Sequence, residues 1–211
     1  MAKTQAEKAA AFEALHKAPG VFVIPNPWDP GSARLLAGLG FKALTTTSAG
    51  YARSIGFPDY NAGRAHVMDH IRAMAPMIDI PLAADLEDGF GLKPEDCAET
   101  IRQGAEAGLV GGSIEDFTGD RSNPIHSIEA AADRIRAAAE AASKLPFKFM
   151  LCARAENFLH NRADLGDTIK RLQAYQDAGA DVLFAPGLNT SDDVRTVIAE
   201  IDALLGKGAG G

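Results

Sequence analysis

The chain has 211 residues, of which 46% are hydrophobic and 23% charged, an ordinary composition for a globular protein and enough for one domain with a large core. Its formal net charge of −7 and the lack of any basic stretch argue against a nucleic-acid partner. The absence of a long apolar run argues against a membrane span.

The chain opens with a charged, alanine-rich stretch, residues 1–20, which lacks the apolar segment and cleavage site of a secretory signal. We therefore expect a cytoplasmic location. From residue 21 onward, short apolar runs alternate with segments of helical periodicity. The predicted strands begin at residues 21, 42, 81, 111, 147 and 180, and the predicted helices that follow them span residues 31–40, 63–78, 94–108, 127–145, 167–179 and 191–205.

These six strand–helix units predict an α/β fold. The strands are continuous apolar runs, which indicates burial on both faces in a parallel sheet covered by helices. Two architectures fit, a doubly wound sheet and a (β/α)8 barrel of the TIM type, and the barrel requires eight units whereas six are evident. Because no linker interrupts the pattern, we predict a single domain over residues 1–205, followed by a disordered tail at residues 206–211.

Acidic side chains gather at the carboxyl ends of the predicted strands, where parallel α/β folds place their sites. Asp85 and Glu87 are two positions apart on one predicted strand, so we expect them on the same face. Together with Glu115 at the end of the neighbouring strand, they suit a hard divalent cation such as Mg²⁺. No histidine lies near them in the sequence, which disfavours zinc.

Arg154, at the end of the fifth predicted strand, has two interpretations. Its guanidinium fork matches a substrate carboxylate, and its charge could equally neutralise the acidic side chains around it. For Asp88 and Asp116, a salt-bridge cluster with Arg154 is the better explanation. The stretch TTTSAG, residues 45–50, offers hydroxyl and backbone N–H groups that suit an anion cradle, with a buried threonine-rich strand as the alternative.

Five stretches between residues 25 and 188 together resemble the isocitrate lyase and phosphoenolpyruvate mutase superfamily, in the family's order. They are PNPWDPGSARLLAGLGFKALTTTSAGYARSIGFPDY, ADLEDGFG, GGSIEDFTGD, CARAENFL and GADVLFAPGL. The resemblance implies a (β/α)8 barrel, Mg²⁺ with Mn²⁺ as the alternative ion, and small 2-oxo or 2-hydroxy carboxylate substrates. It also implies a homo-oligomer, either a dimer or a tetramer. Members of the family form or cleave C–C or P–C bonds next to a carbonyl.

The resemblance further implies functions for particular residues. Asp85 and Glu87 match the family's metal-site acids, and Glu115 matches the acid on the next strand, which holds metal-bound water. Arg154 matches the substrate-binding arginine. The other substrate-binding candidates are Thr46, Thr47 and Ser48 in the cradle, and Asp59 in the loop GFPDY.

The loop after the fourth strand, TGDRSNPIH, departs from both main branches of the family. The lyase branch has a Lys-x-Cys-Gly-His motif here, whereas this loop has no cysteine. The mutase and phosphonopyruvate hydrolase branch has Lys-x-Asn, which the residues Arg-Ser-Asn at 121–123 echo in part. Asn123 therefore joins Arg154 and Glu115 as a candidate catalytic residue, with a turn residue as its alternative interpretation.

We predict a Mg²⁺-dependent enzyme that acts on a small 2-oxo or 2-hydroxy carboxylic acid, as a C–C lyase or decarboxylase through a metal-stabilised enolate. One alternative is a P–C bond mutase or hydrolase acting on phosphonopyruvate or phosphoenolpyruvate. That branch, however, places a histidine after the sixth strand, where this chain has Pro186 and Gly187. The other alternative is a non-catalytic relative, because the family's last two βα units have no counterpart in the sequence.

Overall fold

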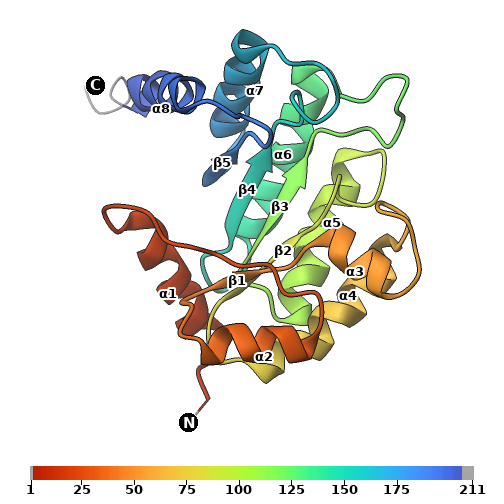
Figure 1. Ribbon diagram of the computed structural model, residues 1–211, viewed down its shortest axis with the longest axis vertical. Coiled ribbons are helices and arrows are strands. Elements are labelled where there is room, and N and C mark those ends of the chain that lie inside the picture. The colour runs from red at the N-terminus through yellow and green to blue at the C-terminus, as the bar shows by residue number, and fades with distance from the viewer. Residues whose placement is uncertain (1, 206–211) are drawn as a thin grey trace.

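A parallel sheet of five strands forms the centre of the protein in a computed structural model that describes residues 2–205 (Figure 1). The predicted tail, residues 206–211, lies outside the described residues. In chain order the elements are α1 (Gln5–Lys17), α2 (Pro30–Gly38), β1 (Leu44–Thr45), α3 (Ser48–Ser54), α4 (Gly63–Met74), the 3₁₀ helix η1 (Ala75–Met77), β2 (Leu82–Asp85), α5 (Pro94–Ala107), β3 (Gly111–Glu115), α6 (Ile128–Ser143), β4 (Met150–Arg154), α7 (Leu165–Asp177), β5 (Val182–Phe184) and α8 (Ser191–Leu205).

The strands lie in the sheet in the same order as in the chain, from β1 to β5, and every neighbouring pair is parallel. Asp85 lies opposite Ser113, and Glu115 lies opposite Arg154. Parallel strands in chain order need a crossover between them, and their carboxyl ends all reach one edge of the sheet. The predicted α/β fold is confirmed, and the polar strand ends share that edge.

Hydrophobic clusters pack against both faces of the sheet. The larger cluster joins the strands to the crossover helices and includes Leu82, Ile101 of α5 and Ile135 of α6. The smaller cluster joins the other face to α1 and includes Phe12 and Met150. Figure 1 shows α1 on the opposite side of the sheet from α5 and α6. Burial on both faces explains why the strands read as continuous apolar runs.

The sequence predicted a first strand at residues 21–26, and this prediction is wrong, so the described sheet has five strands rather than six. The segment is extended and lies beside β1, where Thr45 N donates a backbone hydrogen bond to Pro25 O (3.2 Å). Pro25 and Pro27 have no N–H group, so the segment cannot donate a ladder hydrogen bond at either position. The side chain of Val21, at its start, is fully exposed.

The six predicted helices are confirmed as α2, α4 with η1, α5, α6, α7 and α8. Two further helices, α1 and α3, were not predicted. Helix α3 begins inside the hydroxyl-rich stretch 45–50, because Thr47 is its N-cap and accepts a hydrogen bond from Gly50 N (3.1 Å). Among residues 2–205, no helix has both the length and the apolar character that a membrane crossing requires.

A glycine in β3 allows α1 to approach the sheet closely. A Cβ atom at Gly111 would lie 2.8 Å from Cε1 of Phe12 and 2.9 Å from the backbone oxygen of Met150, which is closer than such atoms pack. Phe12 is only 3% exposed. Helix α1 therefore closes one end of the inner face of the sheet through the Phe12 side chain.

Phe12→Ala is expected to lower the free energy of unfolding by about 3 kcal/mol, because it removes a buried ring and leaves a cavity between α1 and the sheet. Urea unfolding followed by circular dichroism measures this change. Leu35→Ala is the control, since Leu35 is 66% exposed, and it should cost less than about 0.5 kcal/mol. Equal losses in the two variants would contradict the packing of α1 described here.

Candidate active site

Three neighbouring strands end in charged side chains at one edge of the sheet. β2 ends at Asp85, β3 at Glu115 and β4 at Arg154. Because these strands are parallel and adjacent, the three side chains come together instead of alternating between opposite edges. In barrels of βα units, this edge carries the functional groups.

Arg154 lies at the centre of this group and binds three carboxylates. Its Nη1 donates to Asp85 Oδ1 (3.0 Å), its Nη2 lies 3.2 Å from Glu115 Oε2, and its Nε and Nη2 both donate to Glu156 Oε1 (3.0 and 2.7 Å). Burial lowers the pKa of Arg154, but the negative charges of Glu115, Asp85 and Glu156 raise it by more. The net shift is upward, so the guanidinium stays charged. Arg154 therefore neutralises the acidic side chains around it, which is one of its two predicted functions. Its binding of a substrate carboxylate stays a prediction.

Glu115 is almost completely buried, at 2% exposed, and has a second partner besides Arg154. The hydroxyl of Tyr60 donates to Glu115 Oε1 (2.6 Å). Burial raises the pKa of Glu115 well above its ordinary value, Arg154 partly offsets this, and Glu156 and Asp85 add to it. Tyr60 has a left-handed backbone (φ 63°), an uncommon conformation for a residue with a side chain.

Glu87 is the acid whose charge has least compensation. The strand ends at Asp85, and Glu87 follows it with a left-handed backbone (φ 51°), so the alternation expected on a strand does not extend to this residue. Its backbone N–H nevertheless donates to Asp85 Oδ1 (3.3 Å). The side chain is 3% exposed, and its Oε1 has no hydrogen-bond partner among the described residues. Burial and the charges of Asp85, Asp88 and Asp59 raise the pKa of Glu87 to about 8.

Asp88 and Asp116 were predicted to pair with Arg154, and the structure gives them other partners. Asp88 lies 4.0 Å from Arg134, and Asp116 lies 3.0 Å from Arg171. Sequence spacing could not reveal these partners, because both arginines come from the crossover helices α6 and α7 rather than from a strand end. The prediction that both acids form salt bridges is confirmed, while the predicted partner is wrong.

The hydroxyl-rich stretch lies directly against Asp85. Ser48 donates to Asp85 Oδ2 from its hydroxyl (2.7 Å) and its backbone N–H (3.3 Å), and Asp85 N donates to Thr46 Oγ1 (3.2 Å). Thr47 caps α3, as described above. These hydroxyls therefore hold the metal-site candidate Asp85 in place, and their contact with a substrate stays a prediction.

The two loop candidates, Asp59 and Asn123, differ in position. Asp59 lies close enough to Glu87 to raise the pKa of Glu87. The Oδ1 atom of Asp59 accepts a hydrogen bond from Tyr60 N (3.1 Å). Asn123 is exposed, and its backbone oxygen accepts from Thr118 Oγ1 (2.6 Å) within its own loop. Within residues 2–205, no hydrogen bond joins the Asn123 side chain to the acidic group, so its contacts match those of a turn residue.

Sequence reasoning gave no function to Glu156, which is fully buried beside Arg154. Its backbone N–H donates to Asp116 Oδ1 (2.9 Å). The other oxygen of Asp116 accepts from Arg171 (3.0 Å) and from the hydroxyl of Tyr175 (2.5 Å). The position of Glu156, two residues after Arg154 at a strand end, was the available signal. This buried network fixes Glu156 and, through it, the guanidinium of Arg154.

A cavity of about 620 Å³ lies on the inner face of the sheet. Asp85, Arg154 and Thr46 line its polar end, while Phe12 and Phe22 line its apolar part. The cavity can hold a small molecule with charged groups at one end, next to the acids.

The sequence profile of phosphoenolpyruvate phosphomutase matches residues 12–207 of this chain. The chain belongs to this family. It is 30% identical to the 2-methylisocitrate lyase of Bacillus subtilis over 212 residues, which are 96% of this chain and 67% of that protein. The predicted superfamily is thereby confirmed, and the chain is an enzyme of that superfamily.

Solved structures of the family confirm the barrel type of the fold. A protein from Burkholderia cenocepacia J2315, assigned provisionally to the lyase/mutase class, is 56% identical with a TM-score of 0.92, and the match covers 94% of this chain and 71% of that one. A phosphonopyruvate hydrolase, solved with oxalate and Mg²⁺, is 26% identical with a TM-score of 0.80, over 94% of this chain and 68% of that one. The five described strands form a half-barrel sheet like that of these TIM-barrel-like family members.

The family site can be tested for its fit to Mg²⁺. Within the described part of the chain, no three histidine, cysteine, aspartate or glutamate side chains converge closely enough to enclose a metal ion. Mg²⁺ does not need such a cage, because it keeps several waters and binds through one or two carboxylates. Asp85 accepts a hydrogen bond from the backbone N–H of Glu87, and its charge raises the pKa of the Glu87 carboxyl, whose Oε1 is buried and unpartnered, so the two acids are neighbouring oxygen donors of this kind. The residues present therefore fit a largely hydrated Mg²⁺ ion.

Glu87→Gln is expected to stabilise the protein in the presence of a chelator. The pKa of Glu87 in the folded state, about 8, lies above the ordinary value of 4.5, so folding becomes less favourable as pH rises through this window. The amide removes this penalty, and the gain should be absent below pH 4.5 and reach about 1 to 3 kcal/mol at pH 8.

Urea unfolding at pH 4.5 and pH 8 measures the difference between the two proteins. Glu106→Gln is the control, because the Glu106 side chain is 69% exposed, and it should change the free energy of unfolding equally at both pH values. A Glu87→Gln variant that is less stable than the wild type at pH 8 would show that the Glu87 charge is compensated in the folded protein.

Proposed function

We propose that this protein is a Mg²⁺-dependent enzyme that acts on a small 2-oxo or 2-hydroxy carboxylic acid and breaks a C–C bond next to a carbonyl, as a lyase or decarboxylase. One observation carries the proposal: Glu87 has a buried carboxylate oxygen without a partner beside Asp85. The charged form of a buried acid next to another acid is unfavourable, which is why the pKa of Glu87 is raised, and a bound cation would stabilise that charged form. The similarity to a phosphonopyruvate hydrolase solved with oxalate and Mg²⁺ supports the same ion.

Each site residue then has a specific task. Asp85 and Glu87 would hold the ion, and Glu115 would hold one of its waters. When bound, Mg²⁺ would supply positive charge that stabilises the negative oxygen of the enolate formed as the C–C bond breaks. Arg154 would donate one or more of its hydrogen bonds to the substrate carboxylate. Glu156 would keep the guanidinium plane of Arg154 in place through its two hydrogen bonds.

The cradle at residues 46–48 would bind the substrate from the side of α3, with Asp59 in the loop above. Its hydroxyls already surround Asp85, so a molecule that contacts the ion lies within their reach. Asn123 stays a candidate only if its loop moves toward the acids. We also retain Mn²⁺ as the alternative ion and a homo-oligomer as the quaternary structure, which light scattering of the purified protein measures directly.

Mg²⁺ together with oxalate, a mimic of an enolate, is expected to raise the melting temperature by several degrees, because a ligand at about 100 times its Kd stabilises by about 2.7 kcal/mol. Asp85→Ala should abolish this shift. Asp192→Ala is the control, since the Asp192 side chain is 92% exposed, and it should retain the full shift. No shift in the wild type with Mg²⁺ and oxalate would reject the proposed site.

A second candidate is hydrolysis or rearrangement of phosphonopyruvate, which the similarity to a phosphonopyruvate hydrolase favours. Incubation with phosphonopyruvate and Mg²⁺ distinguishes the two candidates. Release of phosphate and pyruvate would establish hydrolysis of the P–C bond, and formation of phosphoenolpyruvate would establish the rearrangement. The second candidate expects either product to disappear in Arg154→Met. Carbon dioxide or a second carbonyl product from 2-oxo diacids, without phosphate release, would establish the C–C candidate instead.

A further inference from the structure

A second cavity, of about 450 Å³, lies next to Tyr60, whose hydroxyl reaches Glu115 of the acidic group. Three loops line it: Asp59 to Asn61, the segment from Phe117 to Pro124, and Leu159 to Asn161. Tyr60 lines this cavity and also donates its hydroxyl to Glu115 (2.6 Å), so the cavity directly adjoins the proposed metal site. The functions given so far to Asp85, Glu87 and Arg154 do not use it.

His160 lines this cavity and also faces the acidic group. Its Nε2 lies 3.6 Å from Glu156 Oε2, and both atoms are buried without a hydrogen-bond partner in the described chain. The ring of Phe117 stacks on the imidazole with a centroid distance of 4.2 Å and an interplanar angle of 3°. The stack fixes the plane of the imidazole, and Glu156 faces one of its two nitrogens.

The position of Glu156 decides which nitrogen carries the proton. A buried carboxylate oxygen favours N–H on the facing nitrogen, which is Nε2. Burial lowers the pKa of His160, Asp116 opposes this, and Arg121 and Arg154 lower it further, so the ring is neutral at neutral pH. In the neutral ring with Nε2–H, the other nitrogen, Nδ1, has a free lone pair and accepts a hydrogen bond.

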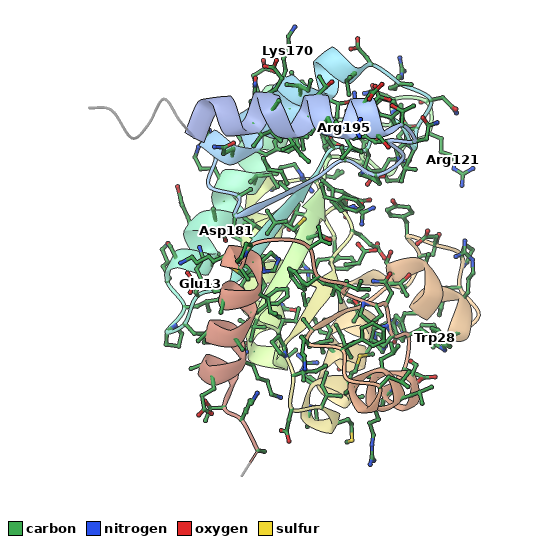
Figure 2. All side chains as sticks on the ribbon, turned by 60° about the vertical axis from the view of Figure 1, so that its left-hand side comes forward. Glu13, Trp28, Arg121, Lys170, Asp181 and Arg195 are labelled. Atoms are coloured by element: carbon green, nitrogen blue, oxygen red, sulfur yellow. The ribbon has the colours of Figure 1, made fainter. Side chains whose placement is uncertain are left out.

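Nδ1 is available for such a bond. Nε2 is buried, whereas Nδ1 is open to solvent and makes no hydrogen bond within residues 2–205. The side chain of His160 is 18% exposed and lines the cavity. Arg121, at the outer rim of the cavity, extends away from the body of the molecule and is open to solvent (Figure 2).

We propose that this cavity binds the end of the substrate that points away from the metal site, and that His160 selects a hydroxyl group there by accepting its hydrogen bond at Nδ1. Arg121 at the rim suits a second carboxylate beyond that hydroxyl. The proposal rests on the proposed function and deepens it, since it specifies a hydroxylated 2-oxo diacid as the class of substrate.

The test compares two diacids that differ by one hydroxyl group, 2-oxoglutarate and 4-hydroxy-2-oxoglutarate, in the presence of Mg²⁺. The wild type should prefer the hydroxylated compound roughly tenfold, the worth of one hydrogen bond to a positioned acceptor. Preference is measured as a ratio of Kd values by calorimetry, or of kcat/KM values if the compounds are turned over.

His160→Phe keeps an aromatic ring on Phe117 but removes both nitrogens, so the ratio should fall to about one. His160→Gln provides an amide oxygen as acceptor and should recover part of the preference. Oxalate is too short to reach the cavity, so both variants should bind Mg²⁺ and oxalate as the wild type does. His66→Phe is the matched control, because His66 is exposed on α4 beside Phe57 and should leave every value unchanged.

The results separate this inference from the proposed function. Failure of the wild type to bind Mg²⁺ and oxalate would reject the proposed function. Binding of oxalate without any preference between the two diacids would overturn the inference alone, and this measurement needs no variant. A His160→Phe protein that binds oxalate normally and keeps the wild-type preference would overturn it as well.

Discussion

The positive charge of Arg154 is the condition on which the polar end of the sheet depends. One guanidinium contacts Asp85, Glu115 and Glu156, and the last two are almost fully excluded from water. Burying a carboxylate costs several kcal/mol unless it is paired. One guanidinium does not compensate all of these acids, so the pKa values of Glu115 and Glu156 stay raised, and Glu87 adds a fourth acid next to Asp85. In the proposed function, a bound cation would offset this imbalance.

The surrounding structure holds this charge in place by two separate routes. The register of β3 and β4 places Glu115 opposite Arg154, which fixes the backbone on both sides. Independently, Asp116 binds the backbone of Glu156 and is itself held by side chains from α7. Because sheet and helix agree on the position of one side chain, the arginine is pre-organised before any ligand binds.

Elements that follow a local sequence pattern were predicted well from the sequence, whereas contacts between distant residues were predicted poorly. Apolar runs and capping residues predicted six of the helices and the parallel sheet, since each of these depends on residues near one another in the chain. The false strand at residues 21–26 shows the limit of this approach. Its apolar residues suggested a strand, but the prolines at and just after its end cannot donate ladder hydrogen bonds. For the site, the strand ends placed Asp85, Glu115 and Arg154 correctly beside one another.

Other site features depended on contacts that sequence spacing does not contain. Tyr60 reaches Glu115 from a position 55 residues away. His160 and Glu156 are four residues apart, but they face one another in a turn after β4 that belongs to no regular helix, so helical periodicity did not indicate the pair. Glu87 was placed by strand alternation, yet the chain leaves the strand at Asp85 and turns into a left-handed conformation. Positive φ angles and loop-to-strand contacts are set by the assembled fold, so local patterns could not reveal them.

Both oxygens of Asp85 are already engaged, Oδ1 by Arg154 and Oδ2 by Ser48. In the proposed function, Asp85 would bind an ion by giving up part of its contact with Arg154, because neither of its oxygens is an open position. The affinity for the ion would then be reduced by the free energy of the guanidinium contact that is lost. The same exchange would free an arginine donor for a substrate carboxylate, so in the proposed function the binding of the cation and that of the carboxylate would strengthen each other.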